Sequence, residues 1–287
     1  MLIPGYGMND AVFRYHPGGV SFVEALANAG LQPWTLDPRG TRSSRAPSRR
    51  SRVRLEDQAF IDLPAAMDRV AALSGHERVH AIGCSLGGAL LYAYVGAMAH
   101  RVDRLVAMGS PLTWTDRGGI LRLFGALGPA VSRVPIRGVS ALARAGLPLL
   151  RHLPPSVTGF YVNPQLTDLR DARQVARIVE SPHADVSLRL SQWIRDGDLT
   201  LGGHDVRAGL RQFERPLLLV LATGDGVCPP AAAKPALTAV GGPATLLEVD
   251  HPLHRVSHAD LFLGAHVSEA VFQPIASWLS PAGSQTR

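Results

Sequence analysis

The sequence predicts an α/β fold in which a mostly parallel central sheet is flanked by helices. Short apolar runs bounded by Gly, Pro or Asp alternate with helical patterns, which is typical of βαβ units. The 287 residues are 46% hydrophobic and 18% charged, which is a globular composition. A chain of this length can bury the core of one domain that carries an inserted subdomain.

The predicted strands are short runs of aliphatic residues. They are Leu2–Ile3, Pro33–Leu36, Arg78–Ile82, Arg104–Met108, Leu217–Ala222 and Thr245–Val249. Between them, Glu56–Leu73 carries apolar side chains at helical spacing, which predicts one helix with a single buried stripe. Leu86–Ala97 and Val267–Leu279 are also predicted to be helices.

The alternation stops between Pro111 and about Arg215. This stretch contains amphipathic pieces, among them Ile120–Leu127 and Val139–Leu150, and no convincing strand. We therefore predict a helical cap inserted over residues 111–214 of a core formed by residues 1–110 and 215–287. Two interpretations stay open: a lid over an apolar substrate, or a small helical subdomain with its own core.

The formal net charge is +6, and seven arginines lie between Arg39 and Arg54. No aromatic residue interrupts this run, which favours a solvated loop over a nucleic-acid site. Peripheral contact with an anionic lipid surface is the alternative. No apolar run approaches the roughly 20 residues of a transmembrane helix, so no integral membrane segment is expected. The oligomeric state stays open.

Cysteine content and the first residues of the chain bear on its location. Cys84 and Cys228 are too few for a disulfide framework and lack metal-ligand spacing, and free thiols suit a reducing compartment. The N-terminal residues show no charged leader and no apolar stretch typical of a signal peptide. A cytoplasmic protein is expected.

Residues 83–87 read Gly-Cys-Ser-Leu-Gly and match G-x-S-x-G, the nucleophile elbow. A β-branched strand leads into this segment and a Leu/Ala-rich helix pattern leaves it. Such a turn lifts a serine hydroxyl clear of the sheet, and the helix N-terminus directs backbone N–H groups toward a developing oxyanion. Ser85 is therefore the candidate nucleophile.

Two further segments make the chain resemble the α/β-hydrolase family. Residues 4–7, Pro-Gly-Tyr-Gly, resemble the family's His-Gly-x oxyanion loop, with Pro4 where His is common. Residues 37–40, Asp-Pro-Arg-Gly, resemble its Asp-x-Arg-Gly turn. The resemblance covers residues 1–110 and 215–280. It implies that the backbone N–H groups of Tyr6 and Leu86 form the oxyanion hole.

A nucleophilic serine needs a histidine base and a carboxylate that orients it, and in this family the chain order is Ser, acid, His. Residues 223–229, Thr-Gly-Asp-Gly-Val-Cys-Pro, look like the family's acid loop and make Asp225 the candidate acid. The other usual position, after Met108, offers no carboxylate before Asp116.

Residues 257–264 resemble the His-x-Asp segment of acid-lipase-like and polyhydroxyalkanoate-synthase-like members. This favours His258 as the base, with His251 and His254 as alternatives, and makes Asp260 a structural partner of the loop. Family members have at least one strand before the oxyanion loop, whereas the first predicted strand here begins at residue 2. We therefore expect a sheet that lacks N-terminal strands.

Residues 76–80, His-Glu-Arg-Val-His, match the zinc-peptidase pattern H-E-x-x-H. That chemistry needs a helix, on which residues four apart share one face. Here residues 74 and 75 end a helix and residues 79–82 lead as a strand into the elbow. No metal and no cofactor is expected.

Together these residues predict a serine hydrolase that cleaves a carboxylic ester of a hydrophobic, lipid-like acyl group through an acyl-enzyme. Ser85, Asp225 and His258 would form its triad. Acyl transfer from the same acyl-enzyme is an alternative, although polyester synthases carry Cys where Ser85 stands. A non-catalytic ligand-binding member of the fold is another. The Asp-nucleophile chemistry of dehalogenases is disfavoured by Ser85.

Overall fold

A computed structural model describes residues 1–41, 44, 52–114, 121–126, 146, 149 and 152–280. In this part of the chain a five-stranded sheet has the order β1-β2-β3-β6-β7, and every neighbouring pair is parallel. The strands are β1 (Leu2–Ile3), β2 (Val79–Cys84), β3 (Val102–Met108), β6 (Leu217–Ala222) and β7 (Ala244–Val249). The predicted parallel α/β architecture is confirmed.

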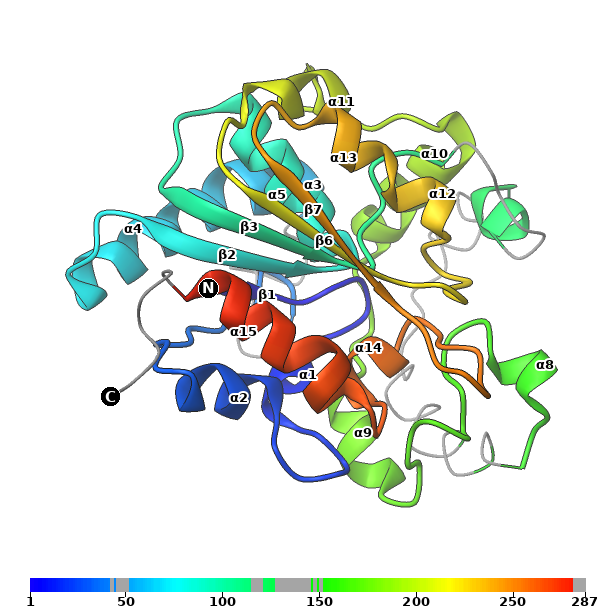
Figure 1. Cartoon of the computed structure of the whole chain (residues 1–287). Helices are drawn as coiled ribbons and strands as arrows, with labels where there is room; N and C mark the ends of the chain where they lie inside the picture. Colours follow the sequence, from blue (N-terminus) through cyan, green and yellow to red (C-terminus); the bar gives the residue numbers. More distant parts are fainter. Residues whose placement is uncertain are drawn as a thin grey trace.

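Two helical layers cover the sheet (Figure 1). One face packs against helices α4 (Leu63–Ser74), α5 (Leu86–Ala97), α11 (Val206–Gly209), α12 (Pro230–Ala233) and α13 (Pro235–Ala239). The other face packs against α1 (Ala11–Arg14), α2 (Phe22–Asn28), α14 (Asp260–Leu263), η3 (Ser268–Phe272) and α15 (Gln273–Leu279). Successive residues of β6 alternate between the two apolar clusters, because side chains of a strand point to opposite faces. The continuous apolar run of β6 is thus that of a doubly covered strand.

Two predicted elements differ in detail. Pro33–Leu36 makes a single bridge, between Thr35 and Leu2, because Pro33 has no N–H and β1 is only two residues long. The predicted helix Glu56–Leu73 starts as α3 (Leu55–Asp57) and passes through a π-helical turn, η1 (Gln58–Asp62), into α4.

The described part of the predicted cap is mainly helical. Residues 121–126 form a helix, followed by α8 (Pro155–Thr158), α9 (Ala172–Ile178) and α10 (Ala184–Asp196). Residues of the predicted helix Val139–Leu150 lie outside the described residues except for 146 and 149. The sequence did not predict the short hairpin of β4 (Thr200–Leu201) and β5 (His204–Asp205), whose Gly202 and Gly203 both have positive φ.

Helix α10 has no core of its own, because its buried side chains belong to the same apolar cluster as those of α5. They are Val186, Leu190, Trp193 and Ile194. The 3₁₀ turn η2 (Leu210–Gln212) continues this contact, since Leu210 is buried in the same cluster. The described cap therefore packs onto the core, and its boundaries at 111 and 214 stay a prediction.

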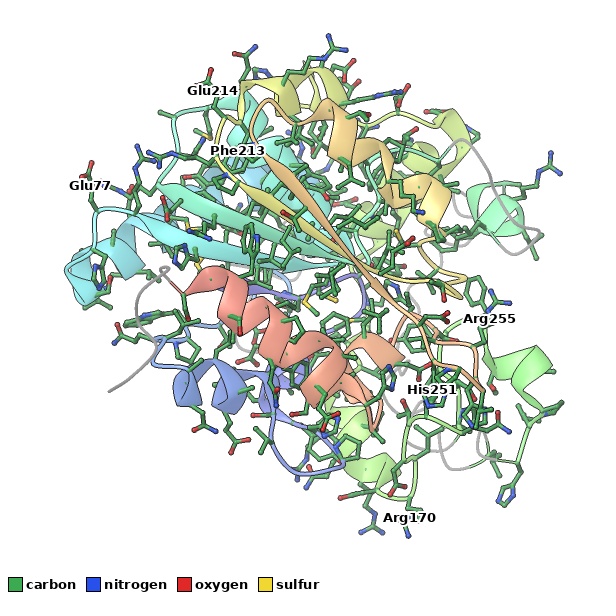
Figure 2. The ribbon with its side chains drawn as sticks, viewed as in Figure 1. Glu77, Arg170, Phe213, Glu214, His251 and Arg255 are labelled. Carbon is green, nitrogen blue, oxygen red and sulfur yellow. The ribbon has the colours of Figure 1, made fainter. Side chains whose placement is uncertain are left out.

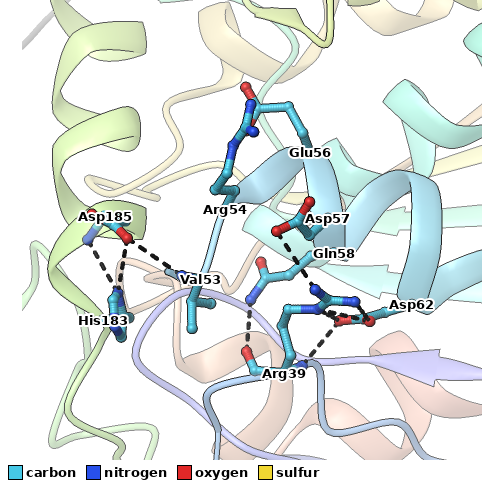
Figure 3. A network of polar contacts seen from close by, with 9 residues as sticks. All are labelled: Arg39, Val53, Arg54, Glu56, Asp57, Gln58, Asp62, His183 and Asp185. Carbon is cyan, nitrogen blue, oxygen red and sulfur yellow. Dashed lines mark hydrogen bonds and ion pairs between the residues drawn. The ribbon is translucent and has the colours of Figure 1, made fainter. Parts of the chain in front are cut away.

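Arg39 is not solvated as predicted for the arginine run (Figure 3). Its guanidinium donates to both carboxylate oxygens of Asp62, at 2.6–3.0 Å, and its carbonyl accepts a hydrogen bond from the Gln58 amide at 3.1 Å. These bonds tie the Asp-Pro-Arg-Gly turn to η1. Nearby, the Val53 N–H donates to Asp185 of α10 at 3.3 Å, which links the cap to the core. Residues 42, 43 and 45–51 of the run lie outside the described residues.

The fold also bears on the His-Glu-Arg-Val-His segment and on membrane-spanning helices. His76 and His80 do not share a helix, because the strand β2 begins at Val79. Across the described ranges, none of the helices combines the length and apolar character needed to cross a membrane.

Candidate active site

Ser85 lies at the sharp turn between β2 and α5, as the elbow pattern predicts. Its backbone has φ 52° and ψ −119°, and it is the one non-glycine residue of the described chain with positive φ. Such a conformation stores strain of about 1–3 kcal/mol and persists only where surrounding contacts impose it. Gly87 allows the close approach of the first strand, because a Cβ there would lie 2.5 Å from the Ile3 carbonyl oxygen. The turn holds the serine on the carboxyl edge of the sheet.

The carboxyl ends of β6 and β7 bring Asp225 and His258 to the same edge. His258 Nδ1 lies 2.6 Å from Asp225 Oδ2, and both side chains are buried. The other carboxylate oxygen, Oδ1, accepts N–H bonds from Val227 at 2.8 Å and Cys228 at 2.7 Å. Because an ionised carboxylate can only accept hydrogen bonds, we assign the imidazole proton to Nδ1, which leaves Nε2 as an acceptor.

A cavity of about 260 Å³ joins Ser85 to His258. Its other walls are almost entirely apolar: Tyr6, Met8, Leu86, Pro111, Trp114, Leu121, Phe124, Phe160, Tyr161, Leu190, Trp193, Ile194, Val227 and Cys228. Within the described part of the chain, the buried His258 Nε2 has no hydrogen-bond partner. His258 Nε2 and Ser85 therefore line one apolar cavity and are not hydrogen-bonded to each other.

The predicted oxyanion residues line the same cavity. The chain passes so close to Ser85 that a Cβ on Gly5 would lie 2.9 Å from Ser85 Cβ. The Tyr6 ring is held by a 2.9 Å hydrogen bond between its hydroxyl and Ser187, and by an edge-on contact with Phe124. Among the described residues, neither the Tyr6 nor the Leu86 N–H donates to a protein acceptor.

The alternative bases, His251 and His254, do not join this group. His251 and His254 lie earlier in the loop after β7, where their rings stack with centroids 5.1 Å apart, and neither lines the cavity. Figure 2 places His251 and Arg255 on this loop beside α8. Asp116 lies outside the described residues. Of the three histidines, only His258 contacts Asp225.

Sequence reasoning missed the cap residues that wall the cavity. Trp193 could have been found, because the buried positions 186, 190, 193 and 194 of α10 follow a helical period. Phe160 and Tyr161 follow the four-residue helix α8 and gave no such signal. The Tyr161 ring lies 6.1 Å from the His258 ring, and burial raises the pKa of its hydroxyl.

Asp260 is a structural partner of the histidine loop, as predicted. Its fully buried carboxylate accepts a 2.8 Å hydrogen bond from the Ser257 N–H. Burial raises its pKa to about 6, against the opposing effect of its hydrogen bonds. Burial also raises the pKa of the Cys84 and Cys228 thiols, so neither cysteine is a ready nucleophile.

Comparisons with known proteins agree with this architecture. Residues 1–254 match the family described as alpha/beta hydrolase fold. The chain is 23% identical over 248 residues to a poly(3-hydroxyalkanoate) polymerase subunit from Haloferax mediterranei. That alignment covers 75% of this chain and 46% of the relative, so the chain spans less than half of the relative's length.

Solved structures with the same fold include two enzymes of distant sequence. A monoacylglycerol lipase from Paleococcus ferrophilus superposes with a TM-score of 0.59 at 17% identity, over 96% of this chain and 91% of the lipase. An esterase from Exiguobacterium antarcticum superposes with a TM-score of 0.61 at 16% identity, over 96% of this chain and 90% of the esterase. At such low identity these similarities establish the fold.

Proposed function

Because the chain belongs to the α/β hydrolase fold family, we propose that it is a serine hydrolase that cleaves carboxylic esters of apolar, lipid-like acyl groups. One observation carries this proposal: His258, held 2.6 Å from the buried Asp225, lines the same apolar cavity as Ser85. A histidine held in this tautomer can accept the proton of a serine hydroxyl, which is otherwise a poor nucleophile.

In the first half-reaction, Ser85 Oγ attacks the ester carbonyl while His258 Nε2 takes the hydroxyl proton. The Tyr6 and Leu86 N–H groups stabilise the oxyanion of the tetrahedral intermediate. When the intermediate collapses, the C–O bond to the alcohol breaks, and His258 returns the proton to the departing oxygen. A water molecule then attacks the acyl-enzyme by the same route, which releases the acid and restores Ser85. Asp225 holds the imidazole throughout.

The test is labelling with a fluorophosphonate, which reacts with an activated serine, followed by mass spectrometry of the adduct. We expect one phosphonate on Ser85 and loss of labelling in His258→Ala. Folded protein that stays unlabelled would contradict the proposal and favour a non-catalytic, ligand-binding member of the family. A label on another serine would show that the nucleophile was assigned to the wrong residue.

The cavity also limits the acyl group. Its walls beside Ser85 are almost entirely apolar, so they favour an alkyl chain over a short or polar acyl group. We therefore expect kcat/KM for p-nitrophenyl esters to rise from acetyl to an optimum at medium-length acyl chains. A preference for acetyl esters over all longer ones would contradict the proposed apolar acyl group, but it would not contradict the proposed ester hydrolysis.

Trp193 is expected to set this limit, because its buried indole lines the cavity and packs edge-on against Trp114 at 5.8 Å. Trp193→Ala should move the optimum to chains longer by at least about two carbons, because the missing indole leaves space for them. Each further CH₂ that is buried there contributes about 0.8 kcal/mol to binding. Trp193→Phe, which retains a ring, is the matched control and should shift the optimum less. An unchanged chain-length profile in Trp193→Ala would show that Trp193 does not limit the length of the acyl chain.

Acyl transfer is a second candidate, favoured by the similarity to a poly(3-hydroxyalkanoate) polymerase subunit. In that reaction an alcohol hydroxyl, instead of water, attacks the acyl-enzyme and receives the acyl group. Product analysis with and without added alcohol separates the two. A transferase would form the new ester in preference to the free acid even at low alcohol concentration.

A further inference from the structure

The cap and the loop that carries His258 are joined by a seam of hydrogen bonds. Cap residues 159–167 run beside residues 255–265, which lie about a hundred positions later in the chain. Backbone bonds link Ala259 to Tyr161 and Ala265 to Leu166, both at 2.8 Å. Side-chain bonds link Ser257 to the Gly159 carbonyl at 2.7 Å and Asn163 to the Arg255 carbonyl at 2.9 Å. Phe160 and Tyr161, which wall the cavity, therefore sit on this seam.

One carboxylate lies at the centre of the seam and receives donors from both sides. Asp260 accepts the Asn163 N–H, at 3.1 Å from each oxygen, and the Thr167 hydroxyl at 2.7 Å. From its own loop it accepts the N–H of Ser257, the residue before His258, at 2.8 Å. Asp260 and its three partners are all buried. These described partners are all neutral donors, and their hydrogen bonds offset part of the cost of burying the carboxylate.

The position of this loop determines where the His258 imidazole points. Nε2 has no hydrogen-bond partner in the described part of the chain, so the ring is placed by its bond to Asp225 at Nδ1, by packing against Tyr161 and by its own backbone. A displacement of about 1 Å between reacting groups can cost about 100-fold in rate. The hydrogen bonds that hold Ser257 against the cap therefore also fix the distance between His258 Nε2 and Ser85.

We infer that Asp260 is a positioning residue, which holds the Tyr161 wall of the cavity and the His258 loop together as one unit. The inference rests on the proposed function, because the unit matters for rate only if His258 is the base. A carboxylate suits this task, since its two oxygens accept from three donors at once. An amide of the same shape would offer one oxygen and would turn two N–H donors of its own toward them.

The experiment compares Asp260→Asn with the native chain and with Asp168→Asn. Asp168 is the matched control, because it lies next to Thr167 in sequence, but its carboxylate is partly exposed and, among the described residues, bonds to Arg170 and not to the His258 loop. Amide hydrogen exchange is followed by mass spectrometry on peptides that cover residues 159–167 and 255–265. The rate constant for fluorophosphonate labelling of Ser85 is measured in parallel, well below each variant's melting temperature.

In Asp260→Asn we expect faster exchange in both peptides together, with the rest of the core unchanged, and labelling slower by about 10- to 100-fold. Asp168→Asn should match the native chain in both measurements. Native exchange in either peptide, or a native labelling rate despite faster exchange, would overturn the inference. A uniform increase of exchange across the whole chain would also overturn it, because it would show a general loss of stability.

Two outcomes of the labelling and folding measurements need a separate reading. If the native chain is not labelled at all, the proposed function fails, and the exchange measurement alone decides whether Asp260 joins the cap to the loop. If Asp260→Asn does not fold, Thr167→Val removes one donor on the cap side and keeps the side-chain shape. That variant should speed exchange in residues 159–167 more than in residues 255–265, and unchanged exchange there would overturn the inference.

Discussion

Ser85→Gly is expected to abolish ester hydrolysis and at the same time to stabilise the protein. Loss of the hydroxyl removes the proposed nucleophile, and replacement of a nucleophilic serine lowers kcat by about 10⁴-fold or more. The stability gain follows from the backbone: Ser85 has φ 52° and ψ −119°, where a glycine has no Cβ to strain. After the entropy that glycine adds to the unfolded chain, the free energy of unfolding should rise by about 1 kcal/mol.

Ser85→Ala is the control, because it removes the same hydroxyl and keeps the Cβ. Activity, measured with a p-nitrophenyl ester, should be lost in both variants. Chemical denaturation should show higher stability in the glycine variant alone. Equal stability of the two variants would mean that the strain in the elbow does no more than offset the entropy that glycine adds to the unfolded chain. Substantial activity in either variant would mean that Ser85 is not the nucleophile.

Asp225→Asn is expected to give the second large effect while the fold stays intact. Oδ1 of Asp225 must remain an acceptor, because the Val227 and Cys228 N–H groups both point at it. The new amide nitrogen is then forced to the Oδ2 position, where it donates to His258 Nδ1. The imidazole proton moves to Nε2, and the ring can no longer accept the Ser85 proton. This wrong tautomer should lower kcat by about 10³- to 10⁴-fold.

The matched control is Asp250→Asn, an exposed carboxylate at the end of β7 that accepts a hydrogen bond from Thr223 at 2.9 Å. It should keep native kcat and KM. For Asp225→Asn, steady-state kinetics should show the loss in kcat with KM little changed. Retention of more than about a tenth of the native kcat would show that the carboxylate does not select the tautomer.

The parallel sheet and the helices on its faces could be predicted because their signals are local. The continuous apolar run of β6 and the helical stripe of α4 depend on residues a few positions apart, so both can be recognised from a short stretch of sequence. The elbow was equally local, since the glycines around Ser85 are required by the turn itself. Pro33–Leu36 was less well predicted, because the extent of a strand depends on the length of its partner.

In the candidate site, too, some features follow from short segments and others depend on tertiary contacts. The order and type of Ser85, Asp225 and His258 could be read from their segments, but His251 and His254 share the loop of His258, and spacing alone cannot show which ring reaches Asp225. That choice is made where β6 and β7 end side by side.

By itself the sequence determined the α/β class and predicted the sharp serine turn and the residue types of the proposed triad, because each is carried by a short segment. Only the tertiary structure decided which histidine meets the acid, which cap residues close the cavity, and that Asp260 joins the cap to the histidine loop. The Asn163–Asp260 bond spans 97 positions. Such contacts arise from packing of the whole chain, and no local periodicity encodes them.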